Sequence, residues 1–457
     1  MNRLLAAFWE LAGEAVPEVD VVNGEGVLAS SLAVGELALG AVAAASSAAA
    51  GLASARGSRR PACRVDGAKV RASFQSDRHF RLDGRPAEAF APLSGFWRTG
   101  DGWVRTHANY PHHRARLLAA LALPETAGPE ALSARLRRSS ASEAEGRVLG
   151  AGGLCVAVRS VAAWRQHPQA AAIDRLPLVA WQCLGEAPRR RLGAMPSAPL
   201  LPAAGLRVLD LTRVIAGPVA TRTLALLGAE VLRVDSPRLE EIAWQHLDTG
   251  MGKRSTLLDL GEASGRERFE GLLADADVVA LGYRPGSLDR LGLAPDDLVR
   301  RRPGLVVATL SAWGLEGPFG GQRGFDSIVQ AATGIAMVES NDGVTPGKLP
   351  AQALDHATGY LLAAAVLRAV ALQVRDGASY LVQAHLARTA HWVLAHPCER
   401  TDVPRAVNGV LLERRGDAGL LRYPAPAVEL DGGPKDWRTV AERWGADAPE
   451  WRAERSG

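Results

Sequence analysis

GLRVLDLTRVIAGPVATRTLALLGAEVLRVD, residues 205–235, contains two short apolar runs with a helical pattern between them. LRVLDL (206–211) and AEVLRVD (229–235) are typical of buried strands, because they are short and rich in valine and leucine. GPVATRTLALLG (217–228) is typical of a helix, with proline near its start and glycine at its end. The stretch therefore predicts a strand–helix–strand unit whose two strands run parallel.

The chain beyond this unit repeats the alternation of helical and strand-like segments. We expect, in chain order, a helix over 263–275, a strand over 276–283, a helix near 294–301, a strand over 304–314, helices over 326–338 and 355–377, and a strand over 380–386. Strands that alternate with helices at this spacing form a parallel sheet covered by helices on both faces. The predicted fold class is therefore α/β, with a Rossmann-like doubly wound parallel sheet in a large domain.

The residues before this region predict a smaller α/β domain. DGWVRTHANYPHHRARLLAALAL (101–123) has the pattern of a strand, a turn and a helix, and residues 152–181 have that of a strand, a helix and a strand. A stretch rich in proline, alanine and arginine (187–205) predicts a linker. We expect these divisions: a partial large-domain-like helical segment (1–60), the small domain (61–190), a linker (191–204), the Rossmann-like domain (205–400) and a C-terminal return segment (401–457).

An alanine-rich segment near the N-terminus is similar to a later one. Residues 36–56 begin with Glu36 and end with arginine, and residues 355–375 begin with Asp355 and end with arginine. Duplication and chance similarity of composition both explain the likeness. LALGAVAAASSAAAGLASA (37–55) is long enough to cross a membrane, but alanine, glycine and serine contribute little transfer energy, so we expect a buried helix.

Composition and charge exclude several classes of protein. The chain has 457 residues with a formal net charge of +4, too small an excess for a dedicated nucleic-acid binder. Its four cysteines are widely spaced and form no CxxC motif, which is typical of a reduced compartment. The first residues, with Glu10 in their apolar stretch, do not form a secretory signal. We therefore expect a cytoplasmic protein without nucleic-acid or membrane partners.

Motifs for nucleotides, metals and serine nucleophiles are missing from the sequence. Asp235 ends a predicted strand, where an acid accepts a ribose hydroxyl in NAD-binding domains, but Gly217 stands alone in place of a glycine-rich turn. No NAD and no metal are therefore expected. The histidines lack the spacing of a helical metal pair, so we expect a surface loop and a satisfied helix face. They are His107, His112, His113, His391 and His396.

Two arginine runs and one aspartate also allow structural interpretations. Residues 137–138 and 189–191 are arginine runs, which we expect to be solvated surface. Asp355 precedes an alanine-rich helix and could act as its N-cap. The same helix start would keep its carboxylate ionised for attack on a substrate, with Gly359 leaving open space one turn later.

A series of ordered segments resembles the class III coenzyme A transferases, which include formyl-CoA transferase, carnitine CoA-transferase and the 2-methylacyl-CoA racemases. The resemblance covers 205–395 and rests on the order and spacing of six segments. They are GLRVLDLTRVIAGPVATRTLALLGAEVLRVD (205–235), GKRSTLLDL (252–260), ADVVALGYRPGSLDRLGL (276–293), GLVVATLSAWGLEGPFG (304–320), GFDSIVQAATG (324–334) and LPAQALDHATGYLLAAAVLRA (349–369).

This resemblance implies an activity and a set of site residues. Asp355 falls on the family's nucleophile, which attacks an acyl-CoA thioester and then carries CoA as an aspartyl thioester to a second carboxylic acid. The domain 205–400 is then the CoA-binding catalytic domain. The implied CoA-binding residues are Ile215, Ala216, Leu258, Asp259, Leu260, Gly282, Tyr283 and Arg284, with Arg290 and Arg323 as partners of the CoA phosphates.

The sequence departs from the family at several positions. Phe325 stands where the racemases have a catalytic histidine, and Ile215 where formyl-CoA transferase has a glutamine. Gly282 replaces the family's usual asparagine, and no tetraglycine loop is present. At the N-terminal copy, Glu36 replaces the aspartate, and the extra methylene would displace the carboxylate by about 1 Å, so we expect it to be non-catalytic.

The chain order departs from the family as well. Family members form interlocked dimers and place the small domain after the first part of the large one, whereas here the segments similar to the small domain come first. This order indicates a fusion or permutation that supplies within one chain what a partner usually provides, so homodimer and monomer are both open. A weakened acyl-CoA-binding protein and, with less support, a 2-methylacyl-CoA racemase are the alternative functions.

Overall fold

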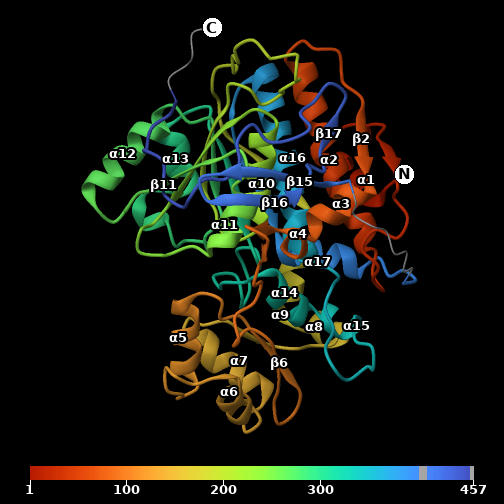
Figure 1. The fold of residues 1–457 in the computed structure, drawn as a ribbon, viewed down its shortest axis with the longest axis vertical. Helices are drawn as coiled ribbons and strands as arrows, with labels where there is room; N and C mark the ends of the chain where they lie inside the picture. The colour runs from red at the N-terminus through yellow and green to blue at the C-terminus, as the bar shows by residue number, and fades with distance from the viewer. Residues whose placement is uncertain (401–408, 453–457) are drawn as a thin grey trace.

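The computed structural model describes residues 1–400 and 409–452. Residues 401–408 and 453–457 of the predicted segment 401–457 lie outside the described residues. A large body contains the main sheet, and a smaller lobe that contains α5, α6, α7 and β6 lies beneath it (Figure 1).

The main sheet has seven strands in the order β11-β10-β9-β12-β13-β14-β8. Its first six strands are mutually parallel, and β8 pairs with β14 in the antiparallel direction. The strands are β8 (Val179–Gly185), β9 (Arg207–Leu211), β10 (Glu230–Asp235), β11 (Arg254–Leu257), β12 (Val278–Leu281), β13 (Val306–Ser311) and β14 (Ser379–His385). The predicted α/β class with a doubly wound parallel sheet is therefore confirmed.

Helices cover both faces of this sheet, as the alternation of side chains along each strand requires. On β9, Val208 packs into the cluster that contains α10 (Ala216–Leu226) and α16 (Ala353–Asp376), whereas Leu209 packs into the cluster that contains α12 (Ala263–Ala274) and α13 (Pro295–Arg301). Both residues are fully buried. The near-continuous hydrophobic runs of the strands follow from this burial on two faces.

The predicted helix over 326–338 is two helices. α14 (Asp326–Thr333) ends at Gly334, which has a φ of +95°, and α15 (Ile335–Val338) begins directly after it. A side chain at Gly334 would also lie 2.6 Å from the backbone nitrogen of Val161, so glycine is required for two reasons. The break turns the chain away at the end of α14.

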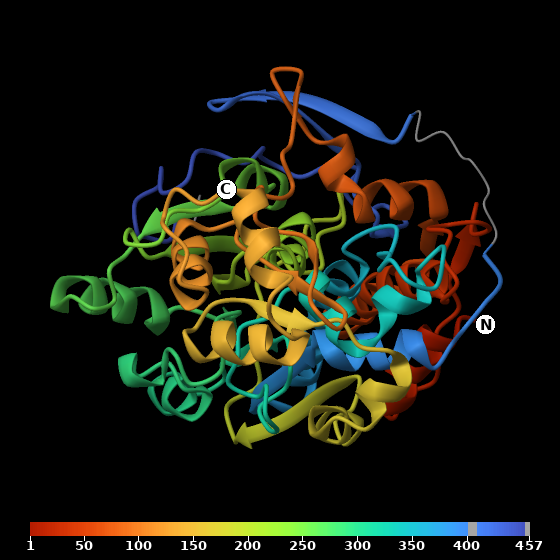
Figure 2. The same ribbon diagram turned by 90° about the horizontal axis from the view of Figure 1, so that it is seen from below.

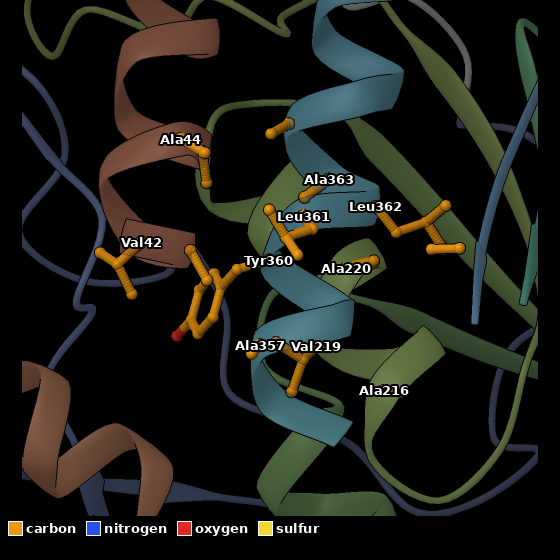
Figure 3. Packing of buried hydrophobic residues seen from close by; sticks show 14 of the residues in the cluster. Val42, Ala44, Ala216, Val219, Ala220, Ala357, Tyr360, Leu361, Leu362 and Ala363 are labelled. Atoms are coloured by element: carbon orange, nitrogen blue, oxygen red, sulfur yellow. The ribbon is translucent and has the colours of Figure 1, made fainter. Parts of the chain in front are cut away.

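The N-terminal alanine-rich segment forms α2 (Val34–Ala55), which packs along α16. Small side chains let the two helices approach closely, and Figure 3 shows Val42 and Ala44 of α2 facing Tyr360 of α16, with α10 on the other side. Both α2 and α16 are long and apolar enough to cross a membrane, but 83% and 78% of their most apolar windows are buried inside the protein. The prediction of a buried helix at residues 37–55 is therefore confirmed.

The smaller lobe is built on the three-stranded sheet β5-β6-β7. These strands and the covering helices are β5 (Phe96–Arg98), β6 (Trp103–Thr106), β7 (Cys155–Ala157), α5 (Pro111–Ala120), α6 (Pro129–Leu136) and α7 (Ala141–Gly150). Its separate core includes Val104, Leu117 and Val148. The chain then passes through α8 (Val161–Arg165) and α9 (Pro168–Asp174) before β8 joins the main sheet.

The remaining elements lie around the large body. They are α1 (Arg3–Leu11), β1 (Asp20–Val22), β2 (Cys63–Asp66), α3 (Gly67–Phe74), α4 (Ser76–His79), β3 (Arg81–Leu82), β4 (Arg85–Pro86), α11 (Ala243–Thr249), a 3-10 turn (Asp289–Leu291), α17 (Leu386–Leu394), β15 (Leu411–Gly416), β16 (Gly419–Pro424) and β17 (Glu429–Leu430). β15 and β16 form a peripheral hairpin that pairs with β3 (Figure 2). The division into domains at residues 60, 190, 204 and 400 stays a prediction.

One of the two arginine runs is not entirely solvated surface. Arg190 forms a salt bridge with Asp277, its Nε donates to Oε1 of Gln373 at 2.8 Å, and its side chain is only 11% exposed. The expectation of a solvated side chain is wrong here, because the linker crosses the sheet edge where buried Asp277 requires a cation. Residues 137–138, 189 and 191 are exposed as expected.

Gly359 of α16 is the point at which α10 comes closest. A Cβ there would lie 2.4 Å from the backbone oxygen of Ala216 and 3.0 Å from Cβ of Val219. The expectation that Gly359 leaves open space is therefore wrong, because the neighbouring helix occupies that space.

We expect Gly359→Ala to lower the free energy of unfolding by about 1–2 kcal/mol, because the clash with backbone outweighs the better helix propensity of alanine. Denaturant unfolding followed by circular dichroism measures the change. Gly51→Ala in α2 is the matched control, since a Cβ there meets nothing within 4 Å, and it should be neutral or stabilising. Equal effects of the two variants would contradict this account of the helix crossing.

Candidate active site

A cleft of about 740 Å³ lies at the carboxyl ends of the parallel strands. Leu211 ends β9, Asp235 ends β10, Leu258 follows β11, Gly282 follows β12 and Ser311 ends β13, and all five line the cleft. Open α/β sheets bind their ligands at this edge, because the loops that leave the strands enclose a crevice there. The main sheet thus positions one wall of the cleft.

Most residues that the sequence predicted for CoA contribute to this wall. The structure brings together Leu258, Asp259, Leu260, Gly282, Tyr283, Arg284, Arg290 and Arg323. Ile215 and Ala216 do not line the cleft: Ile215 immediately precedes α10, and Ala216 is 3% exposed beneath α16 (Figure 3).

The cleft is rich in arginine side chains. Arg284 and Arg290 are exposed residues of its wall, while Arg323 and Arg116 converge on the backbone oxygen of Gly152 at 3.3 and 3.2 Å. Burial, followed by repulsion from Arg284 and Arg116, lowers the pKa of Arg323. Mutual repulsion of this kind indicates a site that gains stability when an anion binds.

The opposite wall comes from the smaller lobe, which the sequence did not assign to the site. Tyr110, His112, His113 and Arg116 line the cleft from the start of α5 and the residue before it. The Tyr110 hydroxyl donates to Oε1 of Glu241 at 2.5 Å and so ties this lobe to the large body. The bunching of histidines at 107–113 was the signal that could have found this wall.

Two of these histidines are buried rather than on a surface loop. His107 is 5% and His113 is 3% exposed. His107 stacks on Phe325 with ring centroids 4.0 Å apart, and His113 meets the same ring edge-on at 5.9 Å. The expectation of a surface loop is wrong for both residues, because the lobe packs them against the start of α14.

Asp355 lies in the first turn of α16 and does not cap it. The helix begins at Ala353, and its N-cap residue Gln352 makes no side-chain cap hydrogen bond. Asp355 is 5% exposed. The capping interpretation therefore fails, because the helix starts two residues earlier than the sequence pattern indicated.

Asp326, the first residue of α14, lies beside Asp355. Oδ2 of Asp326 accepts hydrogen bonds from the backbone nitrogens of Leu354 at 2.8 Å and Asp355 at 3.0 Å, and its Oδ1 accepts from the Gln330 side chain. Burial raises the pKa of Asp326 to about 6. Burial and the charge of Asp326 together raise the pKa of Asp355 well above its ordinary value. Each of the two buried carboxyl groups thus opposes the ionisation of the other.

This acidic pair adjoins residues that line the cleft. Gly324 and Phe325 line the cleft, and Asp326 is the next residue, whereas Asp355 itself is not part of the lining. No hydrogen bond holds the Asp355 carboxylate among residues 1–400 and 409–452, and its oxygens are not among the fully enclosed unpartnered atoms of that part of the chain. The Asp355 carboxylate is therefore buried without a hydrogen-bond partner among the described residues.

Glu36 in α2 has a different environment. Its carboxylate forms a salt bridge with Arg3, and the Arg3 backbone nitrogen donates to Oε1 at 2.7 Å. These two residues are among those that line a hollow of about 260 Å³. The glutamate is thus neutralised by its neighbour, unlike Asp355.

Asp235 and the C-terminal histidines are fully used by protein contacts. Asp235 is 2% exposed, lies 2.7 Å from Nε of Arg233 and accepts from Trp444 at 2.9 Å. His391 lies 2.7 Å from Asp174, and His396 lies 2.7 Å from the backbone oxygen of Trp392. In the part of the chain that the structure describes, no group of three or more histidine, cysteine, aspartate or glutamate side chains could hold a metal ion.

Comparison with known proteins connects this site to a family. The probable fatty acyl-CoA transferase Rv3272 of Mycobacterium tuberculosis is 33% identical over 274 residues, which cover 54% of this chain and 70% of that protein. Succinyl-CoA:glutarate CoA-transferase of Mus musculus is 30% identical over 200 residues, 40% of this chain and 45% of that enzyme. A crystal structure of Rv3272 has a TM-score of 0.41 at 37% identity and covers 43% of this chain and 58% of that one.

A family description matches the same region. Residues 203–417, which include the main sheet from β9 onward and Asp355, match CoA-transferase family III. The chain spans 70% of the mycobacterial relative's length and less than half of the mouse enzyme's. On this match and the 33% identity to the mycobacterial relative, the chain belongs to CoA-transferase family III, a family of enzymes.

Proposed function

We propose that the protein transfers coenzyme A from an acyl-CoA donor to a carboxylic acid acceptor, with Asp355 as the nucleophile. The observation that carries the proposal is the environment of Asp355: a buried carboxylate without a hydrogen-bond donor, beside Asp326, which directly follows Phe325, a lining residue of an arginine-rich cleft. Structural aspartates of a core are paired or hydrogen-bonded, whereas a nucleophile must keep a lone pair available.

The arginines of the cleft suit the phosphate groups of CoA. Guanidinium groups bind phosphates with charge and two parallel hydrogen bonds, and Arg284, Arg290 and Arg323 present them along one wall. Gly282 lets the backbone approach closely, because a Cβ there would lie 3.0 Å from Cβ of Thr212. With its phosphates at this wall, CoA would extend its pantetheine arm toward Phe325 and the acidic pair.

The reaction then proceeds by exchange at one carboxylate. An Asp355 oxygen attacks the thioester carbonyl carbon, the carbon–sulfur bond breaks, and CoA departs as a thiolate. The acyl group is then joined to Asp355 in a mixed anhydride. The thiolate attacks the Asp355 carbonyl carbon, which releases the first acid as a carboxylate and leaves an aspartyl-CoA thioester. The acceptor carboxylate attacks the aspartyl thioester, which releases CoA thiolate and forms a second mixed anhydride. The thiolate then attacks the acyl carbon of the acceptor, which gives the new acyl-CoA and frees the Asp355 carboxylate, so no net proton is taken up.

Asp326 determines when Asp355 can act. Its charge raises the pKa of Asp355, and a carboxylate with a raised pKa is a stronger nucleophile once it is ionised. Asp326 also fixes the first turn of α16, since its carboxylate accepts a hydrogen bond from the backbone amide of Asp355. The smaller lobe, which forms the opposite wall of the cleft, belongs to the same chain.

The two alternative functions have less support. A racemase needs a proton acceptor beside the substrate α-carbon, and Phe325 cannot serve. His113 lies near that ring, but burial lowers its pKa to about 2, which makes it a very weak base. A protein that only binds acyl-CoA would not need an unpaired, buried carboxylate next to a second one.

We expect Asp355→Ala to abolish the covalent adduct and to reduce CoA exchange by at least about a thousandfold, because both depend on the carboxylate. The protein is incubated with acetyl-, succinyl- and hexanoyl-CoA, treated with hydroxylamine or borohydride, and examined by mass spectrometry for modification at residue 355. Glu36→Gln is the matched control, since it removes a carboxylate in the first turn of α2 and should leave both readouts unchanged. Exchange that survives in Asp355→Ala would reject the proposed nucleophile.

We expect adduct formation to slow as the pH falls through the titration of the acidic pair. The pKa of Asp326 is raised to about 6, and burial and the charge of Asp326 raise the pKa of Asp355 well above its ordinary value, so protonation of the pair removes the nucleophile as the pH falls. Asp326→Asn removes the like charge, and the acidic limb should therefore shift to lower pH. Initial rates of adduct formation between about pH 4 and pH 9 measure it, with circular dichroism as the control for folding. If the acidic limb of the pH–rate profile is the same in Asp326→Asn and the wild type, Asp326 does not set the ionisation of Asp355.

A further inference from the structure

Three buried polar groups of the smaller lobe have unpartnered atoms, and two of these groups contact Phe325. Nε of Arg105, Nδ1 of His107 and Nδ1 of His113 each have no hydrogen-bond partner within the described residues. Buried polar atoms without partners destabilise a folded protein, and such groups are commonly satisfied by a ligand. Their concentration at one place indicates that a polar ligand completes them.

Arg105 is the most costly of the three to leave unpaired. It is 8% exposed, and its guanidinium lies over the rings of Phe90 and Phe96 at 5.0 Å from each centroid. It takes part in none of the salt bridges formed among residues 1–400 and 409–452. Burial lowers its pKa to about 10, so the side chain still carries its charge at neutral pH. A buried cation of this kind requires an anion.

The acid that faces Arg105 is Asp326, and its oxygens are already engaged. Asp326 and Arg105 act on each other electrostatically without forming an ion pair. Both Asp326 oxygens instead accept hydrogen bonds from Gln330, Leu354 and Asp355. Arg105 therefore offsets the charge of this region while its donors remain available.

Arg105 does not itself line the cleft, but it is connected to the reacting carboxylate through its neighbours. Arg105 lies in β6, and His107 follows the end of this strand two residues later. His107 stacks on Phe325, the residue before Asp326, and Asp326 binds the amide of Asp355. The end of β6 thus lies next to the segment that carries the acidic pair.

We propose that Arg105 binds the carboxylate of the acceptor acid and holds it against the Asp355 thioester. This inference rests on the proposed function and adds a residue that determines acceptor binding. An acid that approaches Asp355 meets the negative charge of Asp326, and the guanidinium supplies two donors and a positive charge that offset it. His113, neutral and part of the cleft lining, adds a ring nitrogen at the mouth of this subsite.

The experiment compares an anionic with an uncharged nucleophile on the same adduct. The Asp355 adduct is formed with acetyl- or succinyl-CoA in the wild-type protein, Arg105→Gln and Arg105→Lys, and its discharge by acetate, succinate or hydroxylamine is followed by mass spectrometry. In Arg105→Gln, we expect the acid concentration for half-maximal discharge to rise about ten- to a hundredfold, and discharge by hydroxylamine to be unchanged. Arg105→Lys keeps the charge and should recover part of the loss.

Arg98→Gln is the matched control, because Arg98 lies on the neighbouring strand β5, is exposed and contacts only the Trp103 ring among the interactions found for it. It should behave as the wild type. Equal loss with acids and hydroxylamine, or no loss with either, would overturn the assignment of Arg105.

Failure of the proposed function gives a different result. If the wild-type protein forms no adduct, calorimetric titration with acetate and succinate decides the Arg105 site alone. Weaker binding in Arg105→Gln than in the wild type would support the site, and equal dissociation constants, or no binding by either protein, would overturn it.

Discussion

Two carboxyl groups are buried next to each other where α14 and α16 begin, and this proximity is the constraint on which the site depends. Like charges in a poorly solvated place cannot both ionise easily, so the surrounding chain must hold them in position. The backbone amides of Leu354 and Asp355 bind Asp326 from one side, and Gln330 binds it from within its own helix. The close crossing of α16 with α10 at Gly359 then fixes the direction of the helix that carries Asp355.

The arrangement of the large body followed from local patterns in the sequence. The alternation of short apolar runs with helical segments identified the parallel sheet, since each strand is buried on both faces. The carboxyl edge of such a sheet is a general location for ligands, so residues such as Leu258 and Tyr283, which follow strands, could be assigned to the cleft. Ile215 and Ala216 were placed at the same edge, but helix packing directs them away from it.

The contribution of the smaller lobe could not be read from the sequence. His107 and His113 are polar residues in a segment that resembles a loop, and only the docking of this lobe on α14 buries them against Phe325. The same holds for Arg105, whose strand position gave no sign that it lacks an ion pair. Contacts between segments more than 200 residues apart leave no periodic trace, which explains why these residues were missed.

The salt bridge between Arg3 and Glu36 has a consequence for the symmetry of the molecule. α2 and α16 are neighbours of similar composition, yet only α16 begins with an unpaired carboxylate. Under the proposed chemistry, Asp355 is the reacting carboxylate, whereas the carboxylate of Glu36 is held by Arg3. Helix α2 thereby serves as scaffold rather than as a second reacting element, so its sequence can vary as long as it stays packed along α16.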